Sequence, residues 1–327
     1  MTEGFELILP FFPPAIQDLV LDSTVSDLCV NGSRGVYVER DGVMAKADGV
    51  EIAPESLNAA IEQIARRLGQ DISEHSPLLD SRLPNGSRVA AVYPPCSPGG
   101  ATVTIRKFNH WFTTDQLVEG GSMPASVRDR ALAAILNRRN VLISGGTGSG
   151  KTTTLNALLA HVPANDRLVV IEKPMELDIR HENAVRWEAV DALVGREPVS
   201  VAQLVAAALR HRPDRIVVGE VRDHSAYDML QAMNTGHSGS LTTVHADSAI
   251  QALYRIAALA LSAHPNLDPG FVRSQTADAI HFVLHVSRDH QGSRRVTEFG
   301  QVFGYDTSRA QFDFRRFFVW PHAKERR

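Results

Sequence analysis

The sequence is poor in cysteine and has no long apolar run. It contains only Cys29 and Cys96 in 327 residues, which is too few for a disulfide framework or a four-cysteine zinc site within one chain. We therefore expect both cysteines to be small, buried apolar side chains. No stretch approaches the roughly 18 apolar residues of a membrane span. The start, Met1-Thr-Glu-Gly-Phe-Glu6, lacks the basic flank of a signal peptide. These absences predict a cytoplasmic protein.

The sequence also lacks an excess of basic charge. Its formal net charge is -3 and its pI is about 6.5, so it has no global positive field for nucleic acid, although a local basic patch is compatible with these averages. The hydrophobic content of 43% and the charged content of 22% are ordinary for a globular protein, and 327 residues is the length of about two domains. We expect two folded domains and no direct nucleic-acid substrate.

The most specific motif covers residues 145–152, which read Gly-Gly-Thr-Gly-Ser-Gly-Lys-Thr after the apolar run 140–144. In such a phosphate loop, glycines let backbone N–H groups converge on phosphate oxygens, Lys151 reaches the β- and γ-phosphates, and the Thr152 hydroxyl ligates Mg²⁺. The following helix directs its positive dipole end at the anion. The complete signature disfavours a turn that merely joins strand to helix. We predict that ATP is bound, with Mg²⁺, by Gly145, Gly146, Thr147, Gly148, Ser149, Gly150, Lys151, Thr152 and Thr153.

Carboxylates follow two further apolar strands. Glu220 comes directly after Ile216-Val-Val-Gly219, where a nucleotide-hydrolysing enzyme needs a group to orient or deprotonate water. Glu172 ends the run 168–171, and Glu176 follows it. We predict Glu220 as the catalytic base, with Glu172 and Glu176 beside it, and water-mediated contacts from Glu172 and Glu220 to Mg²⁺. The alternative for Glu220 is an ordinary surface carboxylate at the end of a strand.

Two histidines, His237 and His245, bracket a short apolar strand in the segment 235–247. Their spacing matches neither of the usual helical metal pairs. A histidine in such a position is often a hydrogen-bonded structural group, but the nearby strand-end carboxylates make a γ-phosphate sensor or a switch between elements an equal alternative. We keep His237 as a nucleotide-binding candidate and His245 as a catalytic one.

The first part of the chain has the pattern of a small α+β domain. Turn dipeptides separate strand-like runs, and apolar residues recur at helical spacing in one segment. We expect strands at 27–30, 36–39, 88–93 and 101–108 and a helix at 54–68. The segment 113–124 contains Gly120, Gly121 and Pro124 without apolar periodicity, which favours a linker. The predicted domains are therefore 1–112 and 125–327, joined by the linker 113–124.

The remainder of the chain alternates helical and strand patterns, which predicts a doubly wound α/β sheet with its ligand at the carboxyl ends of the strands. The expected helices are 125–138, 151–161, 200–211, 224–234 and 248–262, and the expected strands are 140–144, 167–171, 215–219 and 240–244. Beyond them, 280–287, 294–305 and 311–320 indicate strands that extend the core in antiparallel fashion.

The combination of these motifs resembles the type II/IV secretion, conjugation and type IV pilus family of traffic ATPases. The matching segments are the phosphate loop, the acidic segment 170–177, the strand that ends Gly-Glu-Val-Arg-Asp223, and the histidine segment 235–247. The N-terminal runs 83–89 and 104–108 are most similar to the VirB11, TrbB and CpaF branch. The resemblance covers about 26–247.

This resemblance implies a RecA-like P-loop NTPase domain preceded by a smaller α+β domain, with six chains in a ring. It implies an ATP-driven motor at the inner face of a bacterial membrane, bound peripherally through an inner-membrane platform protein of a secretion or pilus machine. By motif, it also maps phosphate-contacting residues onto Arg88 and Arg106, and onto Lys107 as a further candidate. The alternative for the two arginines is that they are ordinary surface residues.

The chain departs from the family pattern at Lys173, where relatives generally carry an aspartate after the glutamate. A cation at this position keeps open a nucleotide-responsive ring scaffold with little hydrolysis. The chain also lacks the four-cysteine zinc insert of many type II secretion relatives, which favours the conjugation or tight-adherence pilus branch. A small-molecule kinase is a third hypothesis, but no arginine-rich lid segment follows the core.

Overall fold

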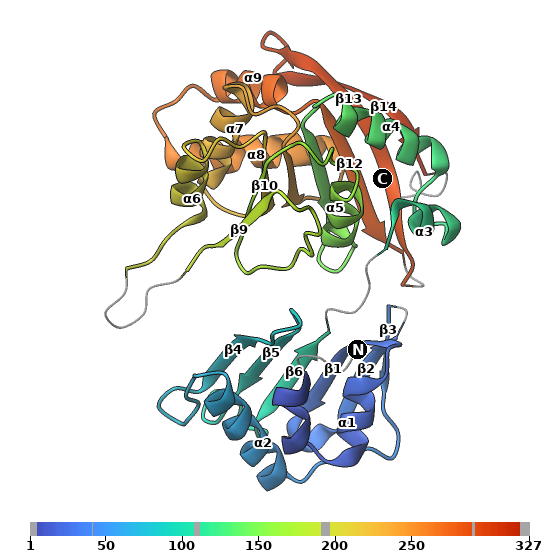
Figure 1. Cartoon of the computed structure of the whole chain (residues 1–327), viewed down its shortest axis with the longest axis vertical. Coiled ribbons are helices and arrows are strands. Elements are labelled where there is room, and N and C mark those ends of the chain that lie inside the picture. The colour runs from blue at the N-terminus through green and yellow to red at the C-terminus, as the bar shows by residue number, and fades with distance from the viewer. Residues whose placement is uncertain (1–4, 41, 108–111, 191–196, 290–291, 321–327) are drawn as a thin grey trace. The chain divides into compact units, whose positions relative to one another are not determined.

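The computed structural model describes residues 5–40, 42–107, 112–190, 197–289 and 292–320. Its internal contacts divide the chain into an N-terminal unit, Met1–His110 with Gln291–Ser293, and a C-terminal unit, Trp111–His290 with Arg294–Arg327. Figure 1 shows the elements of each unit.

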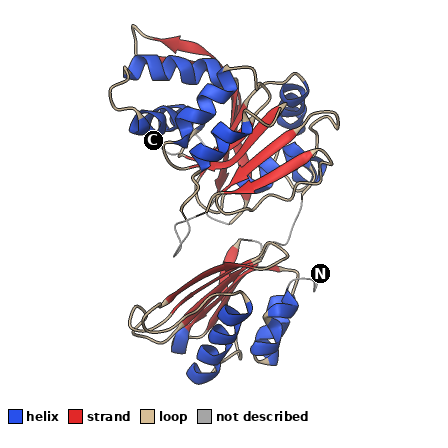
Figure 2. Ribbon diagram, turned by 60° about the vertical axis from the view of Figure 1, so that its left-hand side comes forward, coloured by secondary structure: helices blue, strands red, loops and turns tan. Residues whose placement is uncertain are grey.

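The N-terminal unit is an antiparallel sheet with helices on one face (Figure 2). Its six strands lie in the order β3-β2-β1-β6-β5-β4. The strands are β1 (Val25–Asn31), β2 (Val36–Arg40), β3 (Val43–Lys46), β4 (Leu78–Arg82), β5 (Arg88–Val92) and β6 (Thr102–Arg106), and the helices are α1 (Pro14–Leu21) and α2 (Pro54–Arg67). Short 3-10 helices cover Phe5–Leu7, Leu9–Phe11 and Gly32–Arg34. Alternate residues such as Leu28, Val89 and Ile105 are buried in the core with the helices. Their neighbours along the strands occupy the opposite face.

The C-terminal unit is built on an eight-stranded sheet in the order β14-β13-β12-β7-β11-β10-β8-β9. The strands are β7 (Val141–Gly145), β8 (Leu168–Glu172), β9 (Ala184–Glu188), β10 (Arg215–Val221), β11 (Leu241–His245), β12 (Phe282–Arg288), β13 (Arg294–Asp306) and β14 (Gln311–Val319). The helices are α3 (Thr114–Glu119), α4 (Ala125–Leu136), α5 (Lys151–Leu159), α6 (Val201–Ala208), α7 (Ser225–Asn234), α8 (Ala249–Ala263) and α9 (Pro269–Ala279). The pairs from β12 to β9 are parallel, and β13 and β14 pair antiparallel.

Helices cover both faces of the central part of this sheet, which is why β7 and β8 are buried along their whole length. Leu142 of β7 faces a core formed with α6 to α9, whereas Val141 and Ile143 face a second core with α3 to α5. Figure 1 shows α6 to α9 on one side of the sheet and α3 and α4 on the other. The predicted alternation of strands and helices, and with it the α/β fold class, is confirmed.

The structure differs from the expectations at several elements. Helices α1 and α9 and strands β3, β4 and β9 were not predicted. Strand β12 continues the parallel sheet, because it pairs in register with β7, so only β13 and β14 are antiparallel additions. The segment 113–124, for which we predicted a linker, contains α3. Its N-cap, Thr113, exchanges capping hydrogen bonds with Gln116. The signal for this helix was the capping pair rather than apolar periodicity.

The expectation that both cysteines are buried is wrong. Cys29 is half-buried on β1, and Cys96 is exposed in the turn that follows β5. Burial raises the pKa of the Cys29 thiol. In the parts of the chain that the structure describes, no helix combines the length and the apolar character needed to cross a membrane.

Candidate nucleotide-binding site

The predicted nucleotide-binding residues meet at one edge of the C-terminal sheet. Strands β7, β11, β10 and β8 run parallel, with His245 beside Gly145, Val221 beside Val244, and Val218 beside Ile171. Their carboxyl ends therefore lie at the same edge, which is where α/β sheets bind ligands. The phosphate loop, Glu172, Glu220 and His245 all follow or end these strands.

The phosphate loop requires glycine for two physical reasons. Gly148 and Gly150 have φ angles of 67° and 99°, which side chains with a Cβ rarely adopt. A Cβ on Gly145 would lie 2.2 Å from the Val286 carbonyl oxygen and 2.5 Å from Ser149 Oγ. The loop thus presses against β12 while its backbone winds into the first turn of α5. This local structure fits the predicted phosphate cradle.

Lys151 is held inside the loop. Its ammonium group donates hydrogen bonds to the carbonyl oxygens of Gly145 at 3.1 Å and Gly146 at 2.9 Å. Burial lowers the pKa of Lys151, and the nearby Glu220 carboxylate opposes that shift. Lys151 is thus a buried cation whose ammonium group contacts two carbonyl oxygens. It lies at the start of α5, where the helix dipole also favours an anion. The loop therefore concentrates positive charge where phosphate groups are expected.

Glu172 organises the acidic segment that follows β8. Its side chain is 3% exposed, and its Oε1 accepts hydrogen bonds from the backbone N–H groups of Glu176 at 2.7 Å and Leu177 at 2.9 Å. Arg186 of β9 places Nη2 3.7 Å from Glu172 Oε2. A Cβ on Gly219 would come within 2.9 Å of Glu172 Cγ. Glycine at position 219 is therefore what lets this buried carboxylate pack against β10.

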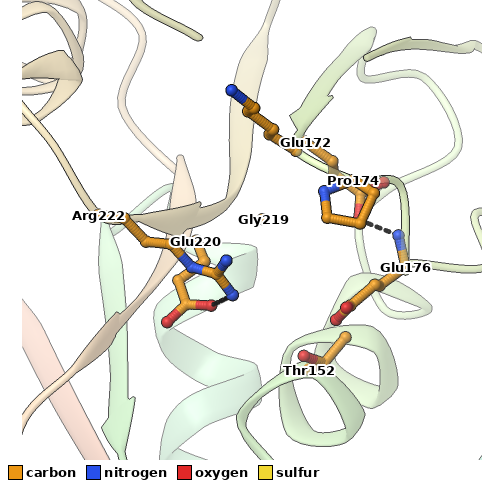
Figure 3. A pocket seen from close by; sticks show the side chains of 8 residues that line it. Thr152, Glu172, Pro174, Glu176, Gly219, Glu220 and Arg222 are labelled. Atoms are coloured by element: carbon orange, nitrogen blue, oxygen red, sulfur yellow. Dashed lines mark hydrogen bonds and ion pairs between the residues drawn. The ribbon is translucent and has the colours of Figure 1, made fainter. Parts of the chain in front are cut away.

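A small, open cavity of about 20 Å³ lies between these strand ends. Figure 3 shows its lining side chains. They are Thr152, Glu172, Lys173, Pro174, Glu176, Gly219, Glu220 and Arg222. The predicted Mg²⁺ ligand Thr152 and the predicted acids thus line one space.

This lining fits a magnesium ion held mainly by water and phosphate. Among the described residues, no group of three or more His, Cys, Asp or Glu side chains is arranged to hold a metal. Mg²⁺ usually keeps several waters and binds one or two protein ligands together with substrate phosphates. A hydroxyl on α5 facing carboxylates across a polar cavity agrees with that chemistry.

Glu220 is ion-paired with a residue to which the sequence analysis assigned no role. Arg222 Nη2 donates a hydrogen bond to Glu220 Oε2 at 2.5 Å, and this bond is the main reason that the pKa of Arg222 is raised. Arg186, which lies near Glu172, was also missed because β9 itself was not predicted. The sequence pattern gave no signal for Arg222, because this residue lies beyond the end of β10, where the alternation of side chains along a strand does not apply.

The two histidines lie at opposite edges of the sheet. His245 ends β11 beside Gly145 and is exposed at the phosphate edge. His237 precedes β11, and its Nδ1 lies 3.3 Å from the carbonyl oxygen of Ala232. The intervening turn is held by Asn140, at the start of β7, whose side-chain oxygen accepts from the Gly239 N–H at 2.7 Å. Within one chain, His237 therefore does not join the phosphate loop, whereas His245 stays a candidate.

The arginines predicted from the resemblance are neighbours on the N-terminal sheet. Arg88 pairs in register with Arg106 on one side and with Arg82 on the other. Arg88 lies 2.9 Å from Asp80, and Arg106 lies 2.8 Å from Asp27. Three guanidinium groups on neighbouring strands repel one another, and the carboxylates of Asp80 and Asp27 offset only part of that repulsion. The row marks a concentration of positive charge, and Arg82 is a member that the sequence analysis missed.

Lys107 has a structural role within the N-terminal unit. Its buried ammonium group donates hydrogen bonds to the carbonyl oxygens of Val20 at 2.9 Å and Asp22 at 2.5 Å, at the end of α1. Burial lowers its pKa to about 8. Because the amine is used to satisfy helix carbonyls, we withdraw Lys107 as a phosphate-contacting candidate.

The chain is similar to known proteins both in sequence and in fold. The family described as "Type II/IV secretion system protein" matches residues 14–293. The chain is 33% identical over 294 residues to the conjugal transfer protein TrbB of Rhizobium radiobacter, covering 89% of this chain and 87% of that protein. It is 34% identical over 300 residues to the type IV secretion system protein PtlH of Bordetella pertussis, covering 83% and 88%. The crystal structure of the pilus retraction motor PilT with bound ADP has the same fold, with a TM-score of 0.63, 22% identity and coverage of 90% and 83%.

Proposed function

Because this chain belongs to the type II/IV secretion system protein family and has TrbB and PtlH among its relatives, we propose that it is an Mg²⁺-dependent ATPase that powers a secretion, conjugation or pilus-assembly machine. The observation that carries the proposal is the meeting of the phosphate loop, Thr152 and strand-end carboxylates around one cavity. Phosphoryl transfer depends mainly on such positioning and charge stabilisation.

Each residue of the site has a distinct part in this proposal. The loop N–H groups and Lys151 bind the phosphates, and Thr152 contributes a hydroxyl to Mg²⁺, which neutralises phosphate charge when it is bound. Glu220 orients the attacking water and accepts its proton. Glu172 holds the backbone of Glu176 in place and contacts the metal through water. His245 monitors the terminal phosphate from the neighbouring strand end.

The proposal includes the assembly that the family resemblance implies. Six copies form a ring that associates peripherally with the inner membrane through a platform protein, and ATP turnover moves the N-terminal units as rigid bodies. Support comes from the relatives, which are named as conjugal transfer and type IV secretion proteins. In this proposal, the chain does not bind nucleic acid directly, even where the machine transports it.

Arg88 and Arg106 are proposed to approach the nucleotide phosphates when the ring closes. Their placement side by side in one row of the sheet supports a shared anionic ligand. Replacing either arginine by alanine is expected to impair ATP turnover more than it impairs the folding of the N-terminal unit, which its melting temperature reports. Mixing such a variant with wild-type chains tests whether the arginines act across subunits, since a strictly additive loss of activity would contradict a shared site.

A second candidate function is a nucleotide-responsive ring scaffold with little hydrolysis. It is favoured by Lys173, which places a cation in the cavity lining next to the buried Glu172. A cation there competes with Mg²⁺ for the carboxylates. In this alternative, ATP binding changes the shape of the ring and its affinity for partners, and turnover is incidental.

The test is a joint measurement of mass by light scattering and of phosphate release, with Mg²⁺-ATP and with a non-hydrolysable analogue. We expect a hexamer whose turnover falls by about 10²-fold in Glu220→Gln while nucleotide binding persists, the usual scale for a positioned base. Tight ATP binding with negligible turnover in both wild type and variant would favour the scaffold. Failure of the wild-type protein to bind nucleotide would overturn both candidates.

A further inference from the structure

The ion pair between Glu220 and Arg222 lies where the base would have to act. Glu220 lies near the end of β10, and Arg222 follows the strand. The hydrogen bond from Arg222 Nη2 to Glu220 Oε2 shows that the two side chains meet. Figure 3 shows the pair in the cavity that also contains Thr152 and Glu176. The Glu220 side chain is 22% exposed and the Arg222 side chain is 62% exposed. The acid is therefore held by the sheet, whereas the guanidinium group extends into solvent and is able to change partner.

The charges around Arg222 explain why its guanidinium group lies in the cavity. Glu220 and Glu176 both attract it, and Lys151 lies close enough to interact with Glu220 and Arg222. A carboxylate whose oxygen accepts a bond from a guanidinium group has one fewer lone pair for a proton from water. The pair thus restrains the base in the arrangement that the structure shows.

We infer that Arg222 exchanges partners, pairing with Glu220 when the cavity lacks a terminal phosphate and binding the γ-phosphate when ATP is present. This inference rests on the proposed function. The exchange releases Glu220 to orient water only when a triphosphate occupies the loop. Arg222 is a positioning residue for the base and a binding residue for the γ-phosphate.

The strengths of the two contacts favour the exchange. An exposed ion pair changes an equilibrium constant by up to about fivefold. Arginine forms charge-assisted, often bidentate hydrogen bonds with carboxylates and with phosphates, but a terminal phosphate group carries about 1.5–2 negative charges and three acceptor oxygens, whereas Glu220 carries one charge and two oxygens. Because Arg222 is largely exposed, its rotation toward the phosphate disrupts little packing. A γ-phosphate therefore outcompetes Glu220 for Arg222, whereas ADP lacks the group that would do so.

The test is a double-mutant cycle on the full chain, with binding of a non-hydrolysable ATP analogue and of ADP, each with Mg²⁺, measured by calorimetry. Arg222→Gln is expected to weaken analogue binding by about tenfold and to leave ADP binding within about twofold. Glu220→Gln is expected to tighten analogue binding by about two- to fivefold, because Arg222 is released. That gain is expected to vanish in the double variant.

Three outcomes would overturn the exchange. If the gain from Glu220→Gln persists without Arg222, it comes from relieved repulsion between the carboxylate and the phosphate. If Arg222→Gln weakens ADP and the analogue equally, Arg222 does not distinguish the γ-phosphate. If the wild-type chain binds neither nucleotide, the proposed function fails as well. The exchange fails alone when the wild-type chain binds both nucleotides and the cycle is additive.

Two further sets of variants test this interpretation. Arg222→Lys keeps the charge but loses the guanidinium fork, so analogue binding between those of wild type and Arg222→Gln is expected. Asp313 and Arg315 have the same spacing on the edge strand β14, with Arg315 Nε 3.5 Å from Asp313 Oδ1. Asp313→Asn and Arg315→Gln, alone and together, are expected to leave binding of both nucleotides unchanged. Coupling at this control pair would show that the effect is a general response to lost surface charge.

Discussion

Replacing Gly219 by alanine tests whether the contact between β10 and β8 positions the acidic segment. The added Cβ would lie 2.9 Å from Glu172 Cγ and 3.3 Å from Glu172 Oε1. Glu172 has little freedom to yield, because Oε1 accepts backbone hydrogen bonds at 2.7 Å from Glu176 and 2.9 Å from Leu177. We therefore expect the substitution to displace the carboxylate and to break at least one of these bonds.

The expected magnitude follows from that lost bond. A hydrogen bond to a charged group contributes about 1.5–3 kcal/mol to the free energy of unfolding. Loss of one such bond leaves the buried Glu172 carboxylate with too few hydrogen-bond donors. For a unit of about 200 residues, such a loss corresponds to a fall in melting temperature of about 3–12 °C. Because Glu172 also fixes the segment that carries Glu176, turnover is expected to fall by about 10- to 100-fold.

The assay is thermal unfolding by circular dichroism together with steady-state phosphate release. Gly99→Ala is the matched control, since an added Cβ at Gly99 meets nothing within 4 Å, and it is expected to leave both quantities unchanged. The effect of Gly219→Ala should also disappear in a Glu172→Ala background, where the clashing side chain is gone. A melting temperature and a rate equal to those of wild type, or a full effect of Gly219→Ala in the absence of the Glu172 side chain, would contradict this prediction.

Three other changes test separate parts of the structure. Lys151→Ala should abolish measurable ATP binding by calorimetry, because the loop loses its buried cation, and unchanged affinity would overturn the phosphate-loop assignment. Arg215→Ala should cost about 3–5 kcal/mol in urea unfolding, since Arg215 is fully buried with its Nε 2.7 Å from Asp166 Oδ2; a loss below about 1 kcal/mol would contradict a buried ion pair. Hydrogen bonds from Thr24 and Arg40 lower the pKa of Asp22 from 3.8 to about 2. The stability that they contribute is present above pH 3.8 and lost as pH falls toward 2, so Asp22→Asn should show a weaker acid dependence over that window, and an identical acid profile would refute this.

The phosphate loop and most elements of the C-terminal unit could be predicted from the sequence because their causes are local. The glycines at 145–150 constrain their own backbone, and the spacing of apolar residues determines which face of each helix or strand is buried. The predicted helix at 125–138 and strand at 215–219, for example, correspond to α4 and β10. Strand β9 was missed because its residues are half-exposed at the sheet edge and lack a clear pattern.

Strand order and direction decided which predicted residues meet, because they depend on packing between segments far apart in the chain. His237 and His245 are only eight positions apart in the sequence, yet they lie at opposite ends of β11. Because β11 runs parallel to β7, only His245 lies at the end that carries the phosphate loop. The sequence also contains no sign that Gly219 faces Glu172. That contact exists because β10 and β8 are neighbours in the sheet.

The residues alone predicted a nucleotide-binding loop, an α/β domain that carries this loop, and a carboxylate, Glu220, close to the end of a strand. Those properties reside in short segments whose backbone geometry and periodicity act over a few residues. Folding in three dimensions brings Arg222 into a hydrogen bond with Glu220, sets the Glu172 carboxylate against the acidic segment, and places the Lys107 ammonium group at the end of α1. These roles depend on which buried or charged groups share one space, and close packing and electrostatic pairing decide that only after the sheet has formed.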